Sequence, residues 1–334
     1  MKYNIIKCLI IVSILIKPLL SFADIKMLNV SYDPTRELYQ EYNQAFSKYW
    51  FNKTGQKVLI DQSHGASGKQ ARSVIDGIEA DIVTLALAYD INAISKSELI
   101  DKNWQAKFKN NSAPYTSTIV LLVRKNNPKK IKDWNDLIRN DIEVLSPNPK
   151  TSGGARWGYT AAWTYALKKF NNDENKTREF VSKIFNNVKV LDSGARGSLI
   201  SFTQRNMGDV LISWENEAYL AKKNKDNFDI ILPSVSILAE PSVAIVDKVA
   251  KKHNTTQIAN AYLDYLYSDE GQNIAAKNFY RPTNPAILVK YNTIFKPIKL
   301  YSIQEIFGSW DNAHKKHFAN GAIFDQIMLN RNLK

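Results

Sequence analysis

Short apolar runs alternate along the chain with longer segments in which apolar residues recur every three or four positions. The first pattern is typical of strands buried in a sheet, and the second of amphipathic helices. Alternating strands and helices predict an α/β fold. Strands are predicted at residues 25–32, 57–63, 81–87, 117–124, 143–147, 189–192, 209–214 and 242–247, and helices at residues 35–50, 69–78, 156–169, 177–185, 196–206 and 256–267.

The N-terminus has the features of a signal peptide. A basic start precedes the apolar run 9–16, and SFA at residues 21–23 places small residues at a cleavage site. The run is shorter than the roughly 20 residues that span a bilayer. We therefore expect residues 1–23 to be removed on export to the periplasm. Since Cys8 is the only cysteine, the mature chain is expected to contain neither a disulfide framework nor a Cys-based metal site.

The length and the charge narrow the classes of protein further. A chain of 334 residues usually forms two domains, because single cores stop growing near about 250–300 residues. The net charge is +13 and falls to +10 without Lys2, Lys7 and Lys17. Basic residues alternate with acidic ones, as in KKFNNDENKTRE at residues 168–179, which is typical of solvated helix faces. Nucleic-acid binding is therefore not expected, although the positive field is consistent with attracting a small anion.

The stretch HGASGKQARS at residues 64–73 invites comparison with a nucleotide P-loop. A P-loop needs four residues between its glycines and a hydroxyl after the lysine. Here only two residues separate Gly65 from Gly68, and Gln70 follows Lys69. The sequence therefore excludes a P-loop at this position.

Four predicted strand-to-helix junctions share one design, in which the strand runs into a short turn and a helix begins there. Three of the turns are rich in Ser and Gly, and the fourth has Pro34 where the first helical turn would start. Each junction has unsatisfied N–H groups and a partial positive charge that can hold an anion. Any single one could be ordinary helix capping, but in α/β folds ligands bind at this edge of the sheet. The junctions are residues 31–38, 64–73, 149–163 and 192–202.

Candidates for catalysis are few. The chain has no G-x-S-x-G elbow, no H-E-x-x-H and no G-x-G-x-x-G after a strand. His314 and His317 have a spacing that could place them on one helix face, and a solvated face is the favoured interpretation. His64 could act as a general base, but a structural hydrogen bond to its loop is favoured. Glu215 and Glu217 are two apart and do not face each other on a helix, so an enzyme is not expected.

Long segments of the chain closely resemble the periplasmic sulfate-binding proteins of bacterial sulfate/thiosulfate ABC importers. The likeness runs in order through nearly the whole mature chain. The segments that carry it are VSYDPTRELY, DQSHGASGKQARSVIDGIEADIVTLALAYD, PYTSTIVLLVRKNNPK, PNPKTSGGARWGY, VLDSGARGS, GDVLISWENEA, YLYSDEGQNIAAKNFYRP and HFANGAIFDQI.

The resemblance implies a type II periplasmic binding protein with two α/β domains, mixed sheets and a ligand cleft between the domains. It also implies a dehydrated sulfate dianion held by hydrogen-bond donors, without a salt bridge, a metal or a cofactor. Ala66 departs from the family, which commonly has Gly there. The residues that the resemblance assigns to the ligand are Asp33, Ser67, Gly153, Gly154 and Ala195 through backbone N–H groups, Ser152 through its hydroxyl and Trp214 through its indole N–H.

The chemistry of those groups agrees with a fully deprotonated oxyanion. Backbone and indole N–H groups only donate, and a serine hydroxyl can donate. Hydrogen phosphate would point its own O–H at donors, and an unsatisfied buried polar contact costs roughly 1–3 kcal/mol. Lys69, Arg156 and Arg196 follow the junctions closely, and we expect them to point away from the ligand and pair with carboxylates such as Asp90 or Asp192.

The expected organisation is a discontinuous first domain of residues 24–118 and 243–290, a second domain of residues 119–242, and a C-terminal segment of residues 291–334 packed on both. The resemblance implies a monomer that captures sulfate and delivers it to an inner-membrane permease with ATPase subunits. A thiosulfate-preferring receptor of the same class and a secreted sulfate or phosphate ester hydrolase are the alternatives.

Overall fold

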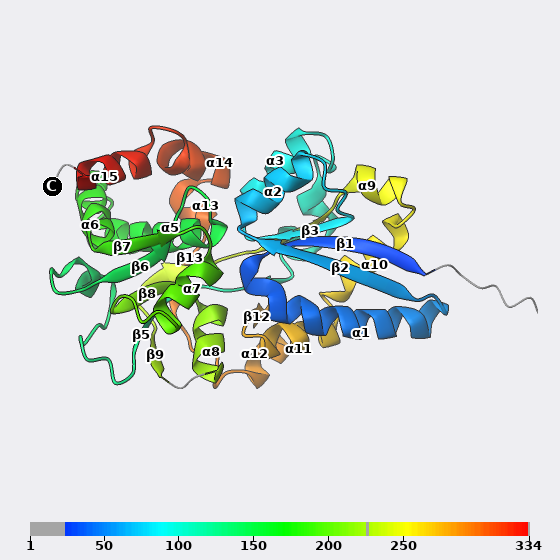
Figure 1. The fold of residues 1–334 in the computed structure, drawn as a ribbon, viewed down its shortest axis with the longest axis horizontal. Helices are drawn as coiled ribbons and strands as arrows, with labels where there is room; N and C mark the ends of the chain where they lie inside the picture. Colours follow the sequence, from blue (N-terminus) through cyan, green and yellow to red (C-terminus); the bar gives the residue numbers. More distant parts are fainter. Residues whose placement is uncertain (1–23, 225–226, 333–334) are drawn as a thin grey trace, which may run out of the picture.

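The computed structural model describes residues 24–224 and 227–332, in which a four-stranded and a five-stranded sheet lie side by side (Figure 1) and two further sheets have two strands each. The predicted signal peptide lies outside the described residues. We call the part built on the four-stranded sheet the first half of the molecule and the part built on the five-stranded sheet the second half.

The sheet of the first half has the order β11-β3-β1-β2. Strand β1 (Ile25–Tyr32) pairs in parallel with β2 (Val58–Gly65) and β3 (Ile82–Leu85), while β11 (Ser242–Ile245) is antiparallel to β3. All residues of β3 and β11 are buried, which explains why their sequences are mostly apolar rather than alternating.

The sheet of the second half has the order β7-β6-β8-β5-β9. Strand β6 (Val144–Pro147) is parallel to β7 (Val188–Asp192) and β8 (Val210–Trp214), and β5 (Ile119–Arg124) is antiparallel to β8 and to β9 (Phe228–Ile231). Both sheets are therefore mixed, as predicted.

Helices cover both sheets, and the first is a good example of why they form. In α1 (Arg36–Thr54), Leu38, Tyr42, Phe46 and Trp50 recur every four residues and are buried, so they form one apolar stripe. Gly55 ends the helix in the left-handed conformation, with φ of 75°. In Figure 1, α1 lies on the opposite face of the sheet from α2 and α3.

The remaining helical elements partly alternate with the strands and partly follow one another, as the helices after residue 246 largely do. Their bounds are η1 (Asp33–Thr35), α2 (Ser67–Ile75), α3 (Ala88–Lys96), η2 (Trp104–Lys107), α4 (Lys109–Ser112), η3 (Trp134–Ile138), α5 (Gly153–Lys169), α6 (Glu174–Asn186), α7 (Ala195–Thr203), α8 (Glu215–Asn224), α9 (Asp247–Lys252), α10 (Thr256–Tyr265), α11 (Asp269–Lys277), α12 (Pro285–Lys290), α13 (Ile303–Phe307), α14 (Trp310–Ala313), η4 (His314–Phe318) and α15 (Ile323–Asn332).

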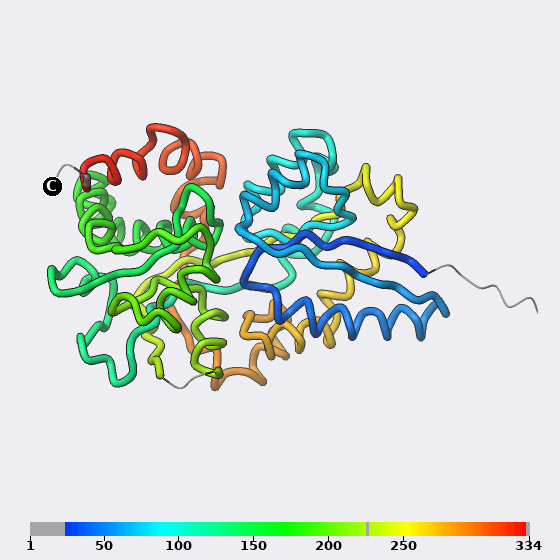
Figure 2. The backbone as a smooth tube through the Cα atoms, viewed as in Figure 1, coloured from blue at the N-terminus to red at the C-terminus, as the bar shows by residue number. Residues whose placement is uncertain are grey.

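The chain passes between the two halves more than once, as the tube in Figure 2 shows. The first passage and the return lie against each other, because Ser117 and Ala239 exchange backbone hydrogen bonds of 2.9 Å in both directions. Nearby, β4 (Tyr115–Thr116) pairs with β12 (Arg281–Pro282). A later passage brings β13 (Lys299–Tyr301) beside β10 (Val235–Ile237).

The C-terminal segment corrects the prediction for two histidines. His314 and His317 were expected on a solvated face, but His317 is 0% exposed and packs against Tyr159, Trp163 and Phe307. His314 is partly buried and stacks on Tyr89 of α3 at a ring distance of 4.2 Å. Lysine neighbours made the segment look polar, whereas the π-helical turn η4 directs both imidazoles into aromatic surroundings.

Candidate ligand-binding site

The carboxyl end of β2 leads through Ala66 directly into α2, and the helix has no side-chain cap within the described structure. The hydroxyl of Ser67 is occupied, because it donates to Asp90 Oδ2 (2.5 Å) and accepts from the Ala86 N–H (3.1 Å). Both contacts lie within the first half. The first N–H groups of a helix have no intrahelical partner, so the backbone of Ser67, which is 2% exposed, is the group free to bind a ligand.

The second junction joins β6 to α5. Ser152 caps α5 by accepting from the Ala155 N–H at 3.3 Å, and its hydroxyl proton remains available to another acceptor. Gly153 and Gly154 form the first helical positions. A Cβ at Gly153 would lie 3.0 Å from Cβ of Ser67, which places the N-terminus of α5 directly against that of α2 and joins the two halves of the molecule.

The third and fourth junctions meet in the same way. Helix α7 begins at Ala195 after Gly194 and has no side-chain cap in the described chain. A Cβ at Gly194 would lie 3.0 Å from Asp33 Oδ2 and 3.7 Å from Cβ of Ala66. The start of η1 at Asp33 therefore lies beside the start of α7, again with one element from each half.

Trp214, at the end of β8, closes this group of helix N-termini. Its side chain is 2% exposed and packs against Tyr32 at a ring distance of 5.6 Å. A Cβ at Gly154 would overlap the indole nitrogen of Trp214 and lie 3.4 Å from Cβ of Ala195. The indole nitrogen has no hydrogen-bond partner among the described residues. A buried donor without a partner is uncommon, and here it lies where a ligand could accept from it.

All the residues assigned from the sequence are thus brought together. Asp33 and Ser67 come from the first half, and Ser152, Gly153, Gly154, Ala195 and Trp214 come from the second. The arrangement offers donors from several helix N-termini to one small acceptor.

The two nearby arginines lie beside carboxylates, as predicted, although the partners partly differ. Arg156 lies 3.8 Å from Asp90 and donates through Nε to the carbonyl oxygen of Pro149. Lys69 is exposed. Asp192 was wrong as a partner, because its Oδ1 accepts from Ser201. Asp192 ends β7, and its Oδ1 is bound by a side chain of α7, while its buried Oδ2 has no hydrogen-bond partner among the described residues.

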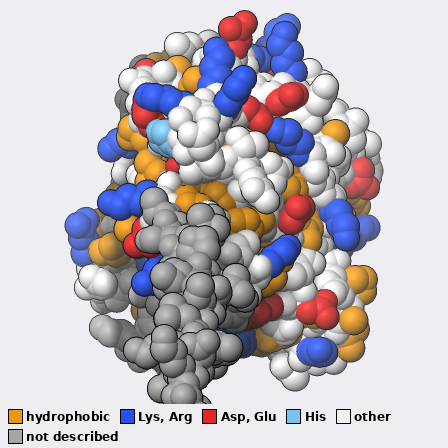
Figure 3. Space-filling model, turned by 90° about the vertical axis from the view of Figure 1, so that its right-hand side faces the viewer, with side chains coloured by type: hydrophobic (Ala, Val, Ile, Leu, Met, Phe, Trp, Pro, Cys, Tyr) orange, Lys and Arg blue, Asp and Glu red, His pale blue; other side chains and the backbone are white. Residues whose placement is uncertain are grey.

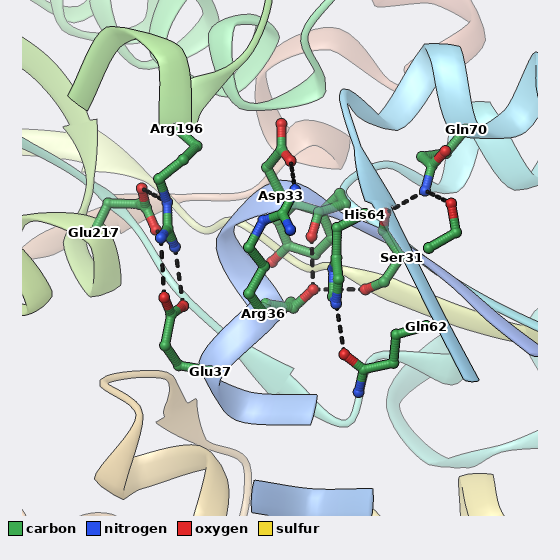
Figure 4. A network of polar contacts seen from close by, with 12 residues as sticks. Ser31, Asp33, Arg36, Glu37, Gln62, His64, Gln70, Arg196 and Glu217 are labelled. Atoms are coloured by element: carbon green, nitrogen blue, oxygen red, sulfur yellow. Dashed lines mark hydrogen bonds and ion pairs between the residues drawn. The ribbon is translucent and has the colours of Figure 1, made fainter. Parts of the chain in front are cut away.

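Arg196 lies between two glutamates (Figure 4). Its terminal nitrogens bind Glu37 of α1 at 2.9 Å each, and Nε and Nη2 bind Glu217 of α8 at 3.1 and 2.9 Å. Burial raises the pKa of Glu217 to about 7, against the lowering effect of Arg196. Burial also acts to raise the pKa of Glu37, but the hydrogen bonds and charge of Arg196 outweigh it and hold that pKa below its usual value.

The sequence did not reveal these glutamates as partners of Arg196. Glu215 and Glu217 do not face each other, as predicted, since Glu215 instead binds Arg281 at 2.7 Å. The sequence signal for cationic partners was the pair of glutamates in WENEA, at residues 214–218, where a buried strand ends. Two carboxylates that are 0% and 1% exposed require cationic partners.

His64 has no arrangement that suggests catalysis. Its Nε2 lies 2.6 Å from Oε1 of Gln62 on the same strand. The hydrogen bond of His64 is therefore structural, as expected, but its partner lies on β2 and not in the loop that follows the strand. Burial, with a smaller contribution from Arg36, lowers the pKa of His64 to about 4, so the ring is neutral at neutral pH.

Neither a metal centre nor a membrane-spanning element stands out within residues 24–224 and 227–332. No cluster of three or more His, Cys, Asp or Glu side chains in that part could hold an ion. None of its helices has the length and apolar character needed to cross a bilayer. On the face shown in Figure 3, basic and acidic side chains are interspersed rather than gathered into one basic stripe.

Comparison with known proteins agrees with this geometry. Residues 28–281 match the family model described as bacterial extracellular solute-binding protein. The chain belongs to this family. The chain is 62% identical over 306 residues to a sulfate-binding protein of Salmonella typhimurium, covering 91% of the chain and 93% of that protein. It is 49% identical over 304 residues to a thiosulfate-binding protein of Pseudomonas aeruginosa, covering 90% and 91%.

A solved structure gives the same result for the fold. The sulfate-binding protein of Mycobacterium tuberculosis matches with a TM-score of 0.80 and 29% identity, covering 88% of this chain and 99% of that one. The predicted two-domain binding-protein fold and the resemblance to sulfate-binding proteins are both confirmed by these relatives. The relatives are named as binding proteins and not as enzymes.

Proposed function

We propose that this protein is a periplasmic receptor that binds sulfate between its two halves and delivers it to a membrane permease driven by ATPase subunits. The domains would be residues 24–118 with 243–290, and residues 119–242, and the protein would act as a monomer without a cofactor. The single observation that carries the proposal is the unpartnered indole N–H of Trp214, buried against Gly154 where the helix N-termini meet.

The proposed donors are the backbone N–H groups of Asp33, Ser67, Gly153, Gly154 and Ala195, the hydroxyl of Ser152 and the indole of Trp214. Hydrogen bonds to a charged acceptor contribute roughly 1.5–3 kcal/mol each, and each helix N-terminus about 0.3–2 kcal/mol. Micromolar binding requires only about 8 kcal/mol. The donors are therefore sufficient even after the cost of removing water from the anion.

The pattern of donors favours an anion that carries no proton. Sulfate is fully deprotonated at neutral pH, so each of its oxygens can accept. Hydrogen phosphate would direct an O–H at a donor, and sites built on hydrogen-bond pattern discriminate by about 10⁴–10⁵. The Arg196 guanidinium is engaged by Glu37 and Glu217, so this cation is not free to grip the ligand, and Arg156 lies 3.8 Å from Asp90.

Calorimetric titration of the mature protein with sulfate, thiosulfate, molybdate and phosphate tests the proposal. We expect sulfate to bind most tightly and phosphate not to compete. Tightest binding of phosphate would contradict the assignment. A preference for thiosulfate would support the second candidate, which the thiosulfate-binding relatives at 49% and 41% identity favour.

An assay with an aryl sulfate and an aryl phosphate tests the absence of catalysis. A receptor shows no turnover, and His64→Ala changes nothing in that assay. Turnover that disappears in His64→Ala would instead indicate an ester hydrolase.

A further inference from the structure

We infer that Trp157 is a positioning residue for the ligand site, because its indole N–H binds the opposite half of the molecule and this bond aligns proposed ligand donors of the two halves. The inference rests on the proposed function and adds a residue outside the proposed ligand shell. Trp157 lies on α5, one turn beyond Gly153 and Gly154. Its side chain is 0% exposed.

The hydrogen bond of Trp157 passes between the two halves. Its Nε1–H donates to the backbone carbonyl oxygen of Ala86 at 2.8 Å. Helix α5 packs on the five-stranded sheet, whereas Ala86 directly follows β3 of the four-stranded sheet (Figure 1). A Cβ at Gly153 would lie only 2.8 Å from Cβ of Ala86. The bond therefore exists only while the start of α5 lies against the end of β3.

The acceptor is held in place by a residue of the proposed ligand shell. The Ala86 N–H donates to the hydroxyl of Ser67 at 3.1 Å, and this hydroxyl donates to Asp90 Oδ2. All three residues belong to the first half. The backbone N–H of Ser67 is itself a proposed ligand donor, so the residue that carries the acceptor is fixed by that same serine.

The donor is held in place by aromatic contacts. The Trp157 ring meets that of Trp214 at a centroid distance of 6.4 Å and an angle of 75°, and that of Trp310 at 4.7 Å and 86°. T-shaped contacts of this kind are a favoured geometry for aromatic pairs. Since Trp214 ends β8 and Trp157 lies on α5, both stay with the second half when the halves separate.

Closure thus connects two proposed donors from opposite halves. Ser67 is linked through Ala86 and Trp157 to Trp214, whose indole is proposed to bind the ligand. On opening, the Trp157 N–H and the Ala86 carbonyl oxygen lose each other. A contact that exists only in the closed form raises the affinity for a ligand that binds the closed form.

Two other indoles donate to protein groups among the described residues, and both bonds lie within one half. Trp104 donates to Asn92 in the first half, and Trp134 donates to the carbonyl oxygen of Val235 in the second, each at 2.9 Å. Trp134 is 0% exposed, like Trp157. Trp134→Phe is therefore a matched control for Trp157→Phe, since both variants remove a buried indole donor from a backbone carbonyl oxygen.

Calorimetric titration with sulfate and urea unfolding of the ligand-free protein are measured for both variants. We expect Trp157→Phe to lower sulfate affinity about tenfold, as for one buried hydrogen bond, and Trp134→Phe to change it less than about twofold. In urea the order should reverse. Trp134→Phe should lower the unfolding midpoint more, because its hydrogen bond is present in the open, ligand-free protein and that of Trp157 is not.

Hydrogen exchange of the indole N–H groups, followed by NMR on the unmodified protein, tests the bond even where Trp157→Phe does not fold. The chain has seven tryptophans. Their signals are assigned from single tryptophan-to-phenylalanine variants, and by elimination for a variant that does not fold. We expect sulfate to slow exchange of the Trp157 indole at least about tenfold and to leave that of Trp134 unchanged, because exchange requires the hydrogen bond to open.

Equal sulfate affinity for Trp157→Phe and the unmodified protein would overturn the inference. So would an equal loss of affinity in Trp134→Phe, or an exchange rate of the Trp157 indole that sulfate does not change. Each of these results leaves the proposed function intact if sulfate still binds and protects the Trp214 indole. Failure of the unmodified protein to bind sulfate would reject the proposed function itself, so the two failures are distinguishable.

Discussion

Two neighbouring regions of this molecule differ in whether they are built from neutral hydrogen-bond donors or from charged side chains. Around Gly153, Gly154 and Trp214, neutral donors meet at helix N-termini and no cation lies among the proposed ligand groups. One residue beyond Ala195, the Arg196 guanidinium is bound by two carboxylates. The first region is built to recognise a ligand by hydrogen-bond direction, and the second holds structure together by charge.

This difference shows how an anion receptor gains selectivity. A free guanidinium would attract any oxyanion, including hydrogen phosphate, because its attraction depends mainly on charge. Directed N–H groups distinguish an acceptor from a donor. Engaging the Arg196 guanidinium with Glu37 and Glu217 therefore protects the selectivity of the neutral region.

Replacement of Gly154 by alanine should have the largest effect on the neutral region. The added methyl would overlap Trp214 Nε1, so the first turn of α5 and the indole cannot keep their positions together. We expect sulfate affinity to fall more than about a hundredfold, since several charged-acceptor hydrogen bonds worth roughly 1.5–3 kcal/mol each are disturbed. Calorimetry measures the loss.

Gly68→Ala is the control for that variant. Gly68 lies in the first turn of α2, but a Cβ there would lie 3.7 Å from the nearest atom, which is an ordinary contact. Its affinity should stay close to that of the unmodified protein. Equal losses in both variants would show that a methyl group at any helix start lowers the affinity. The close approach of Gly154 to Trp214 would then not explain the loss.

Trp214→Phe removes the indole donor while keeping an aromatic ring. We expect a loss of about 10- to 100-fold in sulfate affinity, corresponding to one hydrogen bond to a charged acceptor. Unfolding by urea should show a smaller change, since the ring still packs against Tyr32 and Trp157. Unchanged affinity would remove the indole from the set of ligand donors.

Ser152→Ala should produce a smaller, double effect. The hydroxyl caps α5 and is proposed to donate to the ligand. Loss of such a cap costs about 1 kcal/mol of stability, and loss of one donor about tenfold or more in affinity. Urea unfolding and calorimetry measure the two effects separately, and a stability loss without an affinity loss would confine Ser152 to capping.

The pH dependence of binding should be the smallest effect. None of the proposed donors titrates near neutral pH. Glu217, with a pKa raised to about 7 by burial, lies outside the donor set, and His64 has its pKa lowered to about 4. A lowered histidine pKa contributes stability that is present above about pH 6.5 and lost as the pH falls toward 4. Sulfate affinity should therefore vary less than about twofold between pH 6 and 8. A steep change, abolished by His64→Gln, would place a titrating group at the ligand.

The sequence predicted the fold well where burial and pattern agree. Strand β1 has the predicted bounds, and β6 and β8 begin one residue after the predicted starts. Helices α2, α5 and α7 begin one to three residues earlier than predicted. The reason is that Ser67 and Gly153 are not apolar and Ala195 is followed by Arg196 and Gly197, so apolar periodicity does not include them, although their backbones are already helical.

The sequence was less informative where the structure depends on distant partners. The helix α8 was missed, because its buried face consists partly of Glu215 and Glu217, whose burial depends on Arg281 and Arg196 far away in the chain. The burial of His317 depends likewise on aromatic residues of α5. Junctions were visible locally, but the meeting of four of them at Trp214 follows only from the arrangement of the two sheets.

A crystal structure with sulfate bound measures the contacts between ligand and protein directly. We predict that the sulfate oxygens lie within hydrogen-bond range, about 2.7–3.2 Å, of the N–H and O–H donors around Trp214, while every lysine and arginine nitrogen stays beyond about 4 Å. An arginine fork or a metal ion on the sulfate would contradict this account.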